Sequence, residues 1–248
     1  MHARLVSLFV CSAVAACASA SVMAQQPTTA GLNWGSAKGA LPPAPWQAQF
    51  HPKIKAHTEF ELQAAADGPS WLKIKADKSY GSWVYAFKQP GTVVRELSWQ
   101  WRVEKHPDRA NLRAKDGDDA AVKLCVFVGV DEQKLGLTQR MALGAARTLS
   151  GEDLPAATLC YVWAEKGETI GNVFSNPYTS RVRNMVLRAQ TEGSTAFSEV
   201  RNFQDDALAA FGDELPKGEV RLLGIAVGGD SDNTKSRSVG YIRLLEAR

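Results

Sequence analysis

The sequence has few of the residues and motifs that mark common classes of enzyme. It contains four histidines and four cysteines among 248 residues. It has no Gly-x-Ser-x-Gly elbow, no His-Glu-x-x-His pair and no phosphate-binding loop, so nucleophilic catalysis finds no support. The formal net charge is only +3, and a charge this small gives no reason to expect nucleic acid as a partner.

Long hydrophobic runs are missing after the N-terminus. Residues 1–4 include Arg4, residues 5–16 are mostly apolar, and residues 18–24 are small or apolar. This is the pattern of a secretory signal peptide, and the run is too short for a permanent transmembrane segment. We predict a signal peptide over residues 1–24, cleaved after Ala24 or at the competing site after Ala20, and export to the periplasm.

Residues 14–17 leave a second interpretation open. The sequence Val-Ala-Ala-Cys resembles the bacterial lipobox, in which the cysteine is lipidated and becomes the new N-terminus. A lipid on Cys17 would anchor the protein to the envelope. Without that lipid we predict no membrane tether. Otherwise Cys17 is a small apolar residue of the signal, as Cys11 is.

Two cysteines, Cys125 and Cys160, follow the predicted signal. Each lies in an apolar, strand-like run. An oxidising compartment permits a disulfide between them, but two buried free thiols fit the sequence equally well. With no Cys-x-x-Cys spacing, the pair gives little support for structural zinc.

The rest of the chain predicts one all-β domain. Residues 25–45 are rich in Pro, Ala, Gln and Gly and predict a flexible lead-in, followed by a single domain over residues 46–248. We expect strands near residues 56–63, 70–77, 82–88, 94–103, 119–130, 158–164, 181–190, 196–202, 219–228 and 237–246. Residues 204–212 predict a helix, and residues 137–149 a helical turn or an irregular loop. This content predicts a two-sheet antiparallel β-sandwich of jelly-roll type with one or two short helices.

Alternation within two strands predicts which face is buried. Leu97, Trp99, Trp101 and Val103 share one face of their strand, and Gln100 and Arg102 share the other. In the strand at 119–130, Val122, Leu124, Val126 and Val128 alternate with Lys123, Cys125 and Phe127. We expect Gln100, Arg102 and Lys123 on outward faces. Trp99 and Trp101 either pack in the core or stack on sugar rings.

Two acidic segments far apart in the sequence are the main candidate site. Asp118 and Asp119 precede a strand, whereas Asp230, Asp232 and Asn233 follow one. If these strands are antiparallel neighbours, the carboxylates gather on one rim of a sheet. The spacing of Asp230 and Asp232 suits a calcium ion, or the loop is a turn whose side chains bond to their own backbone.

Other candidates are weaker. Arg181, Arg183 and Arg188 either form a solvated face on an edge strand or bind an anionic ligand such as an acidic sugar. A carboxylate pair formed by Asp118 or Asp119 with Asp230 or Asp232 would be needed for hydrolysis of a glycosidic bond.

Several blocks together resemble one protein family. They are Trp99-x-Trp101-Arg102-Val103, Asp118-Asp119-Ala120-Ala121, Leu159-Cys-Tyr161-Val-Trp163, Glu199-Val-Arg201-Asn202, Phe211-Gly212, and Gly224-Ile-Ala226 through Asp230-x-Asp232-Asn233-Thr234. In this order, over residues 45–246, they resemble the bacterial domain-of-unknown-function family 3047. The resemblance implies an exported, β-rich single domain and leaves the activity open.

Our prediction is an exported protein that binds a ligand, with carbohydrate as the leading class. The predicted ligand-binding residues are Asp118, Asp119, Asp230, Asp232, Asn233, Arg102 and Lys123. One alternative is a glycan hydrolase or lyase that uses paired carboxylates. The other is a non-catalytic structural or interaction protein of the envelope, whose acidic loops hold strand ends together.

Overall fold

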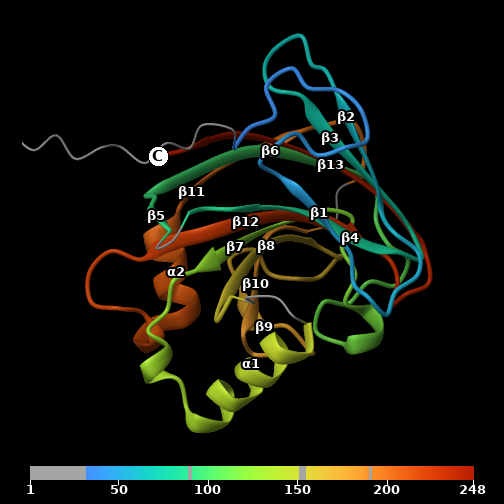
Figure 1. The fold of residues 1–248 in the computed structure, drawn as a ribbon. Coiled ribbons are helices and arrows are strands. Elements are labelled where there is room, and N and C mark those ends of the chain that lie inside the picture. The colour runs from blue at the N-terminus through green and yellow to red at the C-terminus, as the bar shows by residue number, and fades with distance from the viewer. Residues whose placement is uncertain (1–31, 89–90, 151–154, 190–191) are drawn as a thin grey trace, which may run out of the picture.

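Strands with alternating apolar and polar residues form two sheets in this protein. A computed structural model describes residues 32–88, 91–150, 155–189 and 192–248 (Figure 1). The larger sheet has eight strands in the order β1 (Gln47–Gln49), β4 (Tyr80–Ala86), β12 (Arg221–Asp230), β7 (Lys123–Val128), β8 (Thr158–Ala164), β10 (Val182–Ala189) and β9 (Val173–Ser175), with β5 (Thr92–Val93) paired to β12. The smaller sheet has five, in the order β11 (Phe197–Asn202), β6 (Glu96–Lys105), β13 (Arg237–Ala247), β3 (Trp71–Asp77) and β2 (Glu59–Gln63).

These sheets form the predicted β-sandwich. Each of the ten predicted strand regions contains a strand, and β1, β5 and β9 are short additional ones. Neighbouring strands are antiparallel apart from β8 and β10, which run parallel. The smaller sheet lies above the larger one in Figure 1.

Aliphatic and aromatic side chains together fill the space between the sheets, and aromatic rings connect the two layers. Trp99 and Trp101 are fully buried, so the core interpretation of this pair is correct. The ring centroids of Trp101 and Trp163 lie 5.6 Å apart, and those of Trp99 and Tyr161 lie 5.1 Å apart. These contacts join β6 of the smaller sheet to β8 of the larger sheet and fix the two layers against each other.

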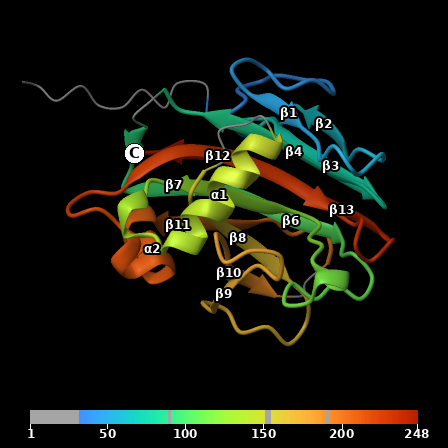
Figure 2. The same ribbon diagram turned by 60° about the horizontal axis from the view of Figure 1, so that its bottom comes forward.

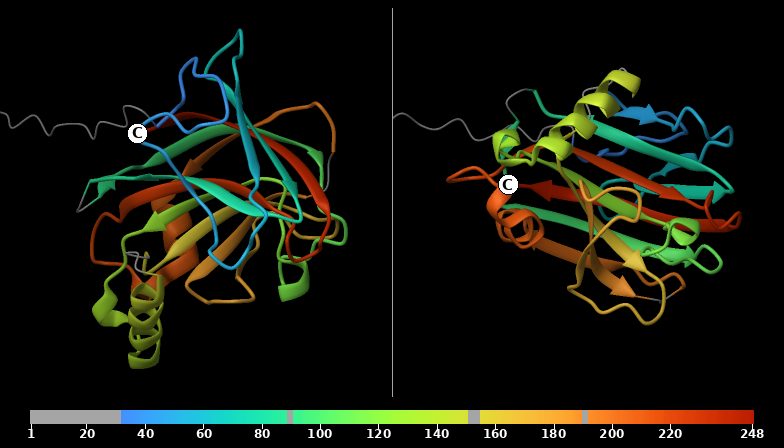
Figure 3. Two further views of the ribbon diagram at one scale, coloured as in Figure 1. Left: turned by 45° about the vertical axis from the view of Figure 1, so that its right-hand side comes forward. Right: turned by 90° about the horizontal axis from the view of Figure 1, so that it is seen from below.

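Helix α2 (Phe203–Phe211) closes one end of this core, as all views show (Figure 3). The side chain of Asn202 accepts hydrogen bonds from the backbone N–H groups of Gln204 and Asp205, which caps the first turn. Gly212 ends the helix with a φ of 46°. The predicted helix over residues 204–212 is confirmed.

Two side chains of the predicted flexible lead-in, residues 25–45, pack against the domain. Leu32 and Trp34 are each 3% exposed, and the Trp46 indole N–H donates a hydrogen bond to the Leu32 carbonyl. The apolar surface of these side chains holds the segment against Trp83. The predicted signal peptide, residues 1–24, and the lipobox-like residues 14–17 with Cys17 lie outside the described residues. No helix in the described part is long and apolar enough to cross a membrane.

Helix α1 (Leu137–Ser150) lies on the outer side of the larger sheet, and Figure 2 shows it crossing in front of the strands. The segment is therefore a helix of 14 residues and not an irregular loop. Among its described side chains Leu143 alone is buried, and it packs on Leu135 and Ala156. The helix thus forms one wall over the sheet without belonging to the main core.

Candidate functional site

The two acidic segments lie together at one rim of the larger sheet, as the antiparallel arrangement predicts. Strands β7 and β12 are antiparallel neighbours, with Lys123 opposite Gly228. The start of β7 therefore lies beside the end of β12. Carboxylate oxygens of Asp119, Asp230 and Asp232 lie within 4.8 Å of one another.

Asp119 holds the loop that follows β12. Its side chain is buried and accepts hydrogen bonds from the backbone N–H groups of Asn233 (3.1 Å) and Thr234 (2.6 Å). The Asn233 amide donates a third hydrogen bond to it, at 3.2 Å. Asp118 is bonded by the Asn176 amide at 2.6 Å. These carboxylates therefore fasten one strand end to another.

Asp230 is buried and pairs with a lysine inside the cluster. Its Oδ1 accepts a hydrogen bond from the Ala120 N–H at 2.7 Å, and its Oδ2 accepts one from the Lys123 ammonium. Burial raises the pKa of Asp230 to about 6, and Lys123 limits the rise. Burial alone would lower the pKa of Lys123, but the Asp230 carboxylate outweighs it and the net shift is upward.

The cluster thus consists of hydrogen-bonded carboxylates with one internal cation, Lys123. Burial raises the pKa of Asp118 and that of Asp232, and the charge of Asp119 adds to both shifts. Asp119, Asp230 and Asp232 offer oxygen atoms that suit a hard cation such as calcium. However, the oxygens of Asp119 and Asp230 already accept hydrogen bonds, and Lys123 supplies positive charge at the position nearest Asp230.

Arg102 does not join this cluster. It lies on the outer face of the smaller sheet, with its guanidinium 3.5 Å from the centre of the Tyr241 ring. Arg243 lies on the same face and bonds to Gln100 and Asp67. Arg102 therefore belongs to a separate, polar face. The other six predicted ligand-binding residues form the acidic rim, namely Asp118, Asp119, Lys123, Asp230, Asp232 and Asn233.

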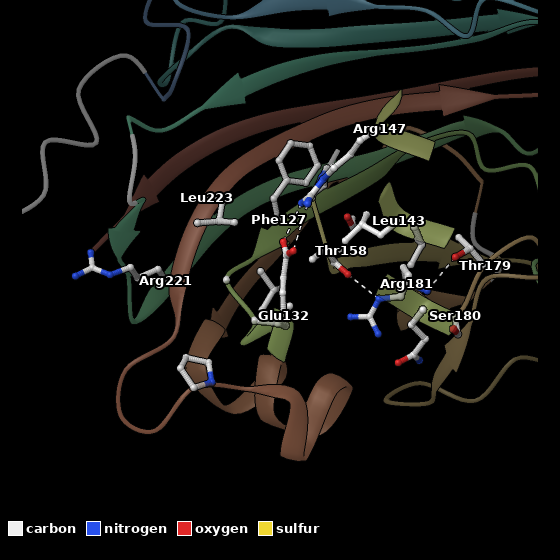
Figure 4. Close-up of a pocket in the computed structure, with 18 of the residues that line it drawn as sticks. Phe127, Glu132, Leu143, Arg147, Thr158, Thr179, Ser180, Arg181, Arg221 and Leu223 are labelled. Atoms are coloured by element: carbon white, nitrogen blue, oxygen red, sulfur yellow. Dashed lines mark hydrogen bonds and ion pairs between the residues drawn. The ribbon is translucent and has the colours of Figure 1, made fainter. Parts of the chain in front are cut away.

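A large cavity lies elsewhere on the larger sheet. Its volume is about 1330 Å³. Strands β4, β7, β8 and β12 form its floor, helix α1 one side, and the segments before β10 and after α2 the others (Figure 4). Sequence reasoning missed this cavity, because its walls come from segments that only the strand order brings together.

The cavity combines apolar and polar walls. Phe127 and Leu223 present apolar surface from the sheet, and Leu143 adds to it from α1. The polar lining residues include Gln49, Glu132, Thr138, Gln139, Arg147, Thr158, Thr179, Ser180, Arg181, Lys217, Glu219 and Arg221. Figure 4 shows Arg147 paired with Glu132, at 2.9 Å, on one side and the Arg181 side chain on another.

Cys125 and Cys160 lie on the outer face of the larger sheet, directly opposite each other on β7 and β8. The structure joins them in a disulfide. They pack with Val162, Val186 and Ala226 in a small apolar cluster outside the main core. The disulfide thus ties together two of the strands that form the cavity floor.

The chain belongs to the family described as "Protein of unknown function (DUF3047)", whose model matches residues 44–246. No curated protein matches it. Similar solved structures include the Trichoderma harzianum endoglucanase 3 from family GH12, at 10% identity, 82% of this chain, 96% of the other and a TM-score of 0.38. A family 12 xyloglucanase from Bacillus licheniformis shares 9% identity over 83% and 98% of the two chains, with a TM-score of 0.35. The xylan-binding module CBM15 shares 10% identity over 86% and 100%, with a TM-score of 0.26. Scores this low support no functional argument.

Proposed function

We propose that the protein is exported and binds a glycan, without catalysis, in the cavity under helix α1. The cavity itself is the observation on which this proposal depends. A volume of about 1330 Å³ is above the usual range for small-molecule sites and has room for several sugar rings. The acidic rim then serves stability, in contrast to our sequence-based assignment.

The mixture of wall residues suits sugars. A pyranose ring presents apolar C–H faces and polar hydroxyl edges, so it needs flat apolar surface beside hydrogen-bonding groups. Phe127 and Leu223 provide apolar surface, and Thr158 and Gln139 provide hydrogen-bonding groups. Tryptophan stacking contributes little, because six of the seven tryptophans are buried and Trp71 is covered by Arg243 at 4.8 Å.

The carboxylates do not favour a hydrolase. Glycoside hydrolysis needs a proton-donating acid and a second carboxylate that both face the substrate. The carboxylates that line the cavity are engaged in ion pairs, Glu132 with Arg147 and Glu219 with Arg95. At the rim, Asp119 and Asp230 are buried and hydrogen-bonded.

Export is supported by residues 1–24. The mass of the protein recovered from the periplasmic fraction tests it directly. A mature chain that begins at Gln25 is expected, whereas a lipid-modified chain that begins at Cys17 would support envelope anchoring. A full-length chain in the cytoplasm would contradict export.

The binding proposal is tested by filling the cavity. Ala142 of α1 lines the cavity and is exposed, so Ala142→Trp adds bulk there without disturbing the core. Ala145 is exposed on the same helix and does not line the cavity, so Ala145→Trp is the matched control. Thermal unfolding with a panel of neutral and acidic oligosaccharides is the measurement.

We expect at least one oligosaccharide to raise the unfolding midpoint of the wild-type protein and of Ala145→Trp. The same sugar should have no effect on Ala142→Trp. An unchanged response in Ala142→Trp would place binding elsewhere. No response to any sugar would overturn the proposed function.

A further inference from the structure

One wall of the cavity contains a buried arginine whose hydrogen-bonding capacity is not filled. Arg181 directly precedes β10, and its side chain is 12% exposed. Its Nε donates a hydrogen bond to the Ala156 carbonyl at 2.6 Å, and its Nη1 lies 2.7 Å from a carboxylate oxygen of Glu214. Its Nη2 is buried and has no hydrogen-bond partner among the described residues. A buried donor without a partner is unfavourable, and a ligand acceptor relieves it once the guanidinium turns toward the cavity, because Nη1 and Nη2 are both shielded from solvent in this structure.

The charges around Arg181 do not balance. Glu214 is shared with Arg183, whose Nη2 lies 3.3 Å from the other carboxylate oxygen. Both guanidinium groups lie near the face of the Phe211 ring, at 4.7 Å for Arg183 and 5.8 Å for Arg181. Two guanidinium groups therefore share one carboxylate. This leaves a surplus of one positive charge at the wall of the cavity.

The position of the surplus charge is specific. Arg181 lines the cavity and Arg183 does not. Arg147 of α1 is paired with Glu132, whereas Lys217 and Arg221 add further positive charge to the lining after α2 and on β12. Figure 4 shows Arg181 beside Thr158 and close to Thr179 and Ser180, whose hydroxyl groups lie within the same lining.

We propose that the cavity selects an acidic glycan, with the carboxylate of a uronic acid residue bound by Arg181. This inference rests on the proposed function and names the substrate class for the same site. A carboxylate has one negative charge and matches the surplus of one positive charge, whereas a phosphate monoester has nearly two. Because Nε and Nη1 already have partners, we expect Nη2 to donate to one oxygen of the ligand carboxylate.

Isothermal titration with trimers of galacturonate, guluronate, mannuronate and glucuronate tests the inference. The fully methyl-esterified form of each trimer is the matched ligand, because esterification removes the charge and keeps the sugar rings. We expect the wild-type protein to bind one acidic trimer about 10- to 100-fold more tightly than its ester, the range of a hydrogen bond to a charged group.

Arg181→Met should bind the acid and the ester with equal affinity. Arg183→Met is the control, because it also removes one partner of Glu214 but changes no residue that lines the cavity. It also removes the surplus positive charge, so it should weaken the preference for the acid without abolishing it, because the Arg181 guanidinium remains at the cavity. Arg181→Lys keeps the charge, and we expect it to recover part of the preference.

Three results would overturn the inference. In the first, acid and ester bind the wild-type protein equally, or neutral oligosaccharides bind and the acids do not. The cavity then binds glycans without recognising an acid group, and the proposed function stands. If Arg183→Met loses the preference as fully as Arg181→Met while both keep the wild-type midpoint of unfolding, Arg181 is not the specific contact. If no acidic or neutral oligosaccharide binds, the proposed function fails together with the inference.

Discussion

Replacing Lys123 by methionine is expected to destabilise the protein by about 3 to 5 kcal/mol, the usual cost of leaving a buried charge without its partner. The Asp230 side chain is 3% exposed and that of Lys123 is 22% exposed, so water reaches the carboxylate poorly. After the substitution Asp230 keeps one hydrogen bond, from the Ala120 N–H. The charges of Asp119 and Asp232 then act on it without compensation.

The cost should depend on pH in a defined direction. Burial raises the pKa of Asp230 to about 6 even with Lys123 in place, and removing the cation raises that pKa further. Below the raised pKa, Asp230 takes up a proton and no longer needs Lys123. Above it, the native state contains a buried carboxylate without a cation. The loss of stability in Lys123→Met should therefore be larger at pH 8 than at pH 5.

Urea unfolding at pH 5 and pH 8, followed by tryptophan fluorescence, measures this loss. The control is Arg237→Met, which breaks the pair with Asp77, a pair with 71% and 47% exposed side chains. An exposed pair contributes about 1 kcal/mol or less. The reasoning is refuted if Lys123→Met costs no more than Arg237→Met, or if its cost is the same at both pH values.

Three further predictions concern stability. Burial lowers the pKa of His106, so stability should fall as the pH drops below about 6.5, where the unfolded chain takes up a proton that the native state resists. His106→Gln should flatten that slope in unfolding curves measured between pH 5 and 8. Gly240→Ala should lower the free energy of unfolding in urea by about 1 to 3 kcal/mol, because its Cβ would overlap a backbone carbonyl of the neighbouring segment. Gly144→Ala is the control, since its Cβ would point into open space on α1, and it should raise the free energy of unfolding by about 0.5 to 1 kcal/mol. Replacing Cys125 and Cys160 together by alanine should cost about 4 kcal/mol for a loop of 35 residues, and a loss below 1 kcal/mol would contradict the disulfide.

Local sequence patterns predict the fold and the acidic rim well. The alternation of Trp99 and Trp101 with polar neighbours predicts that both rings share one face of the strand, and the structure buries that face. Carboxylates before one strand and after another predict a shared rim, because antiparallel neighbours put such ends side by side. The helix predicted over residues 204–212 is likewise present as α2.

The cavity depends on strand order, which local patterns do not contain. Phe127, Leu143, Arg181 and Leu223 are distant in the sequence and meet only when β7, β8, β10 and β12 take their places. The packing of Trp34 is missed for a similar reason. Its segment is rich in residues typical of flexible chains, and tertiary contact with Trp83 overrides that composition.

The most direct test of ligand binding in the cavity is a map of backbone amide shifts during titration with the oligosaccharide that most raises the unfolding midpoint. We expect the largest changes at the amides of Leu143, Thr158 and Arg181, on three walls of the cavity, and no change at Asn233 of the acidic rim. Changes centred on Asn233, with the cavity amides unaffected, would contradict the account.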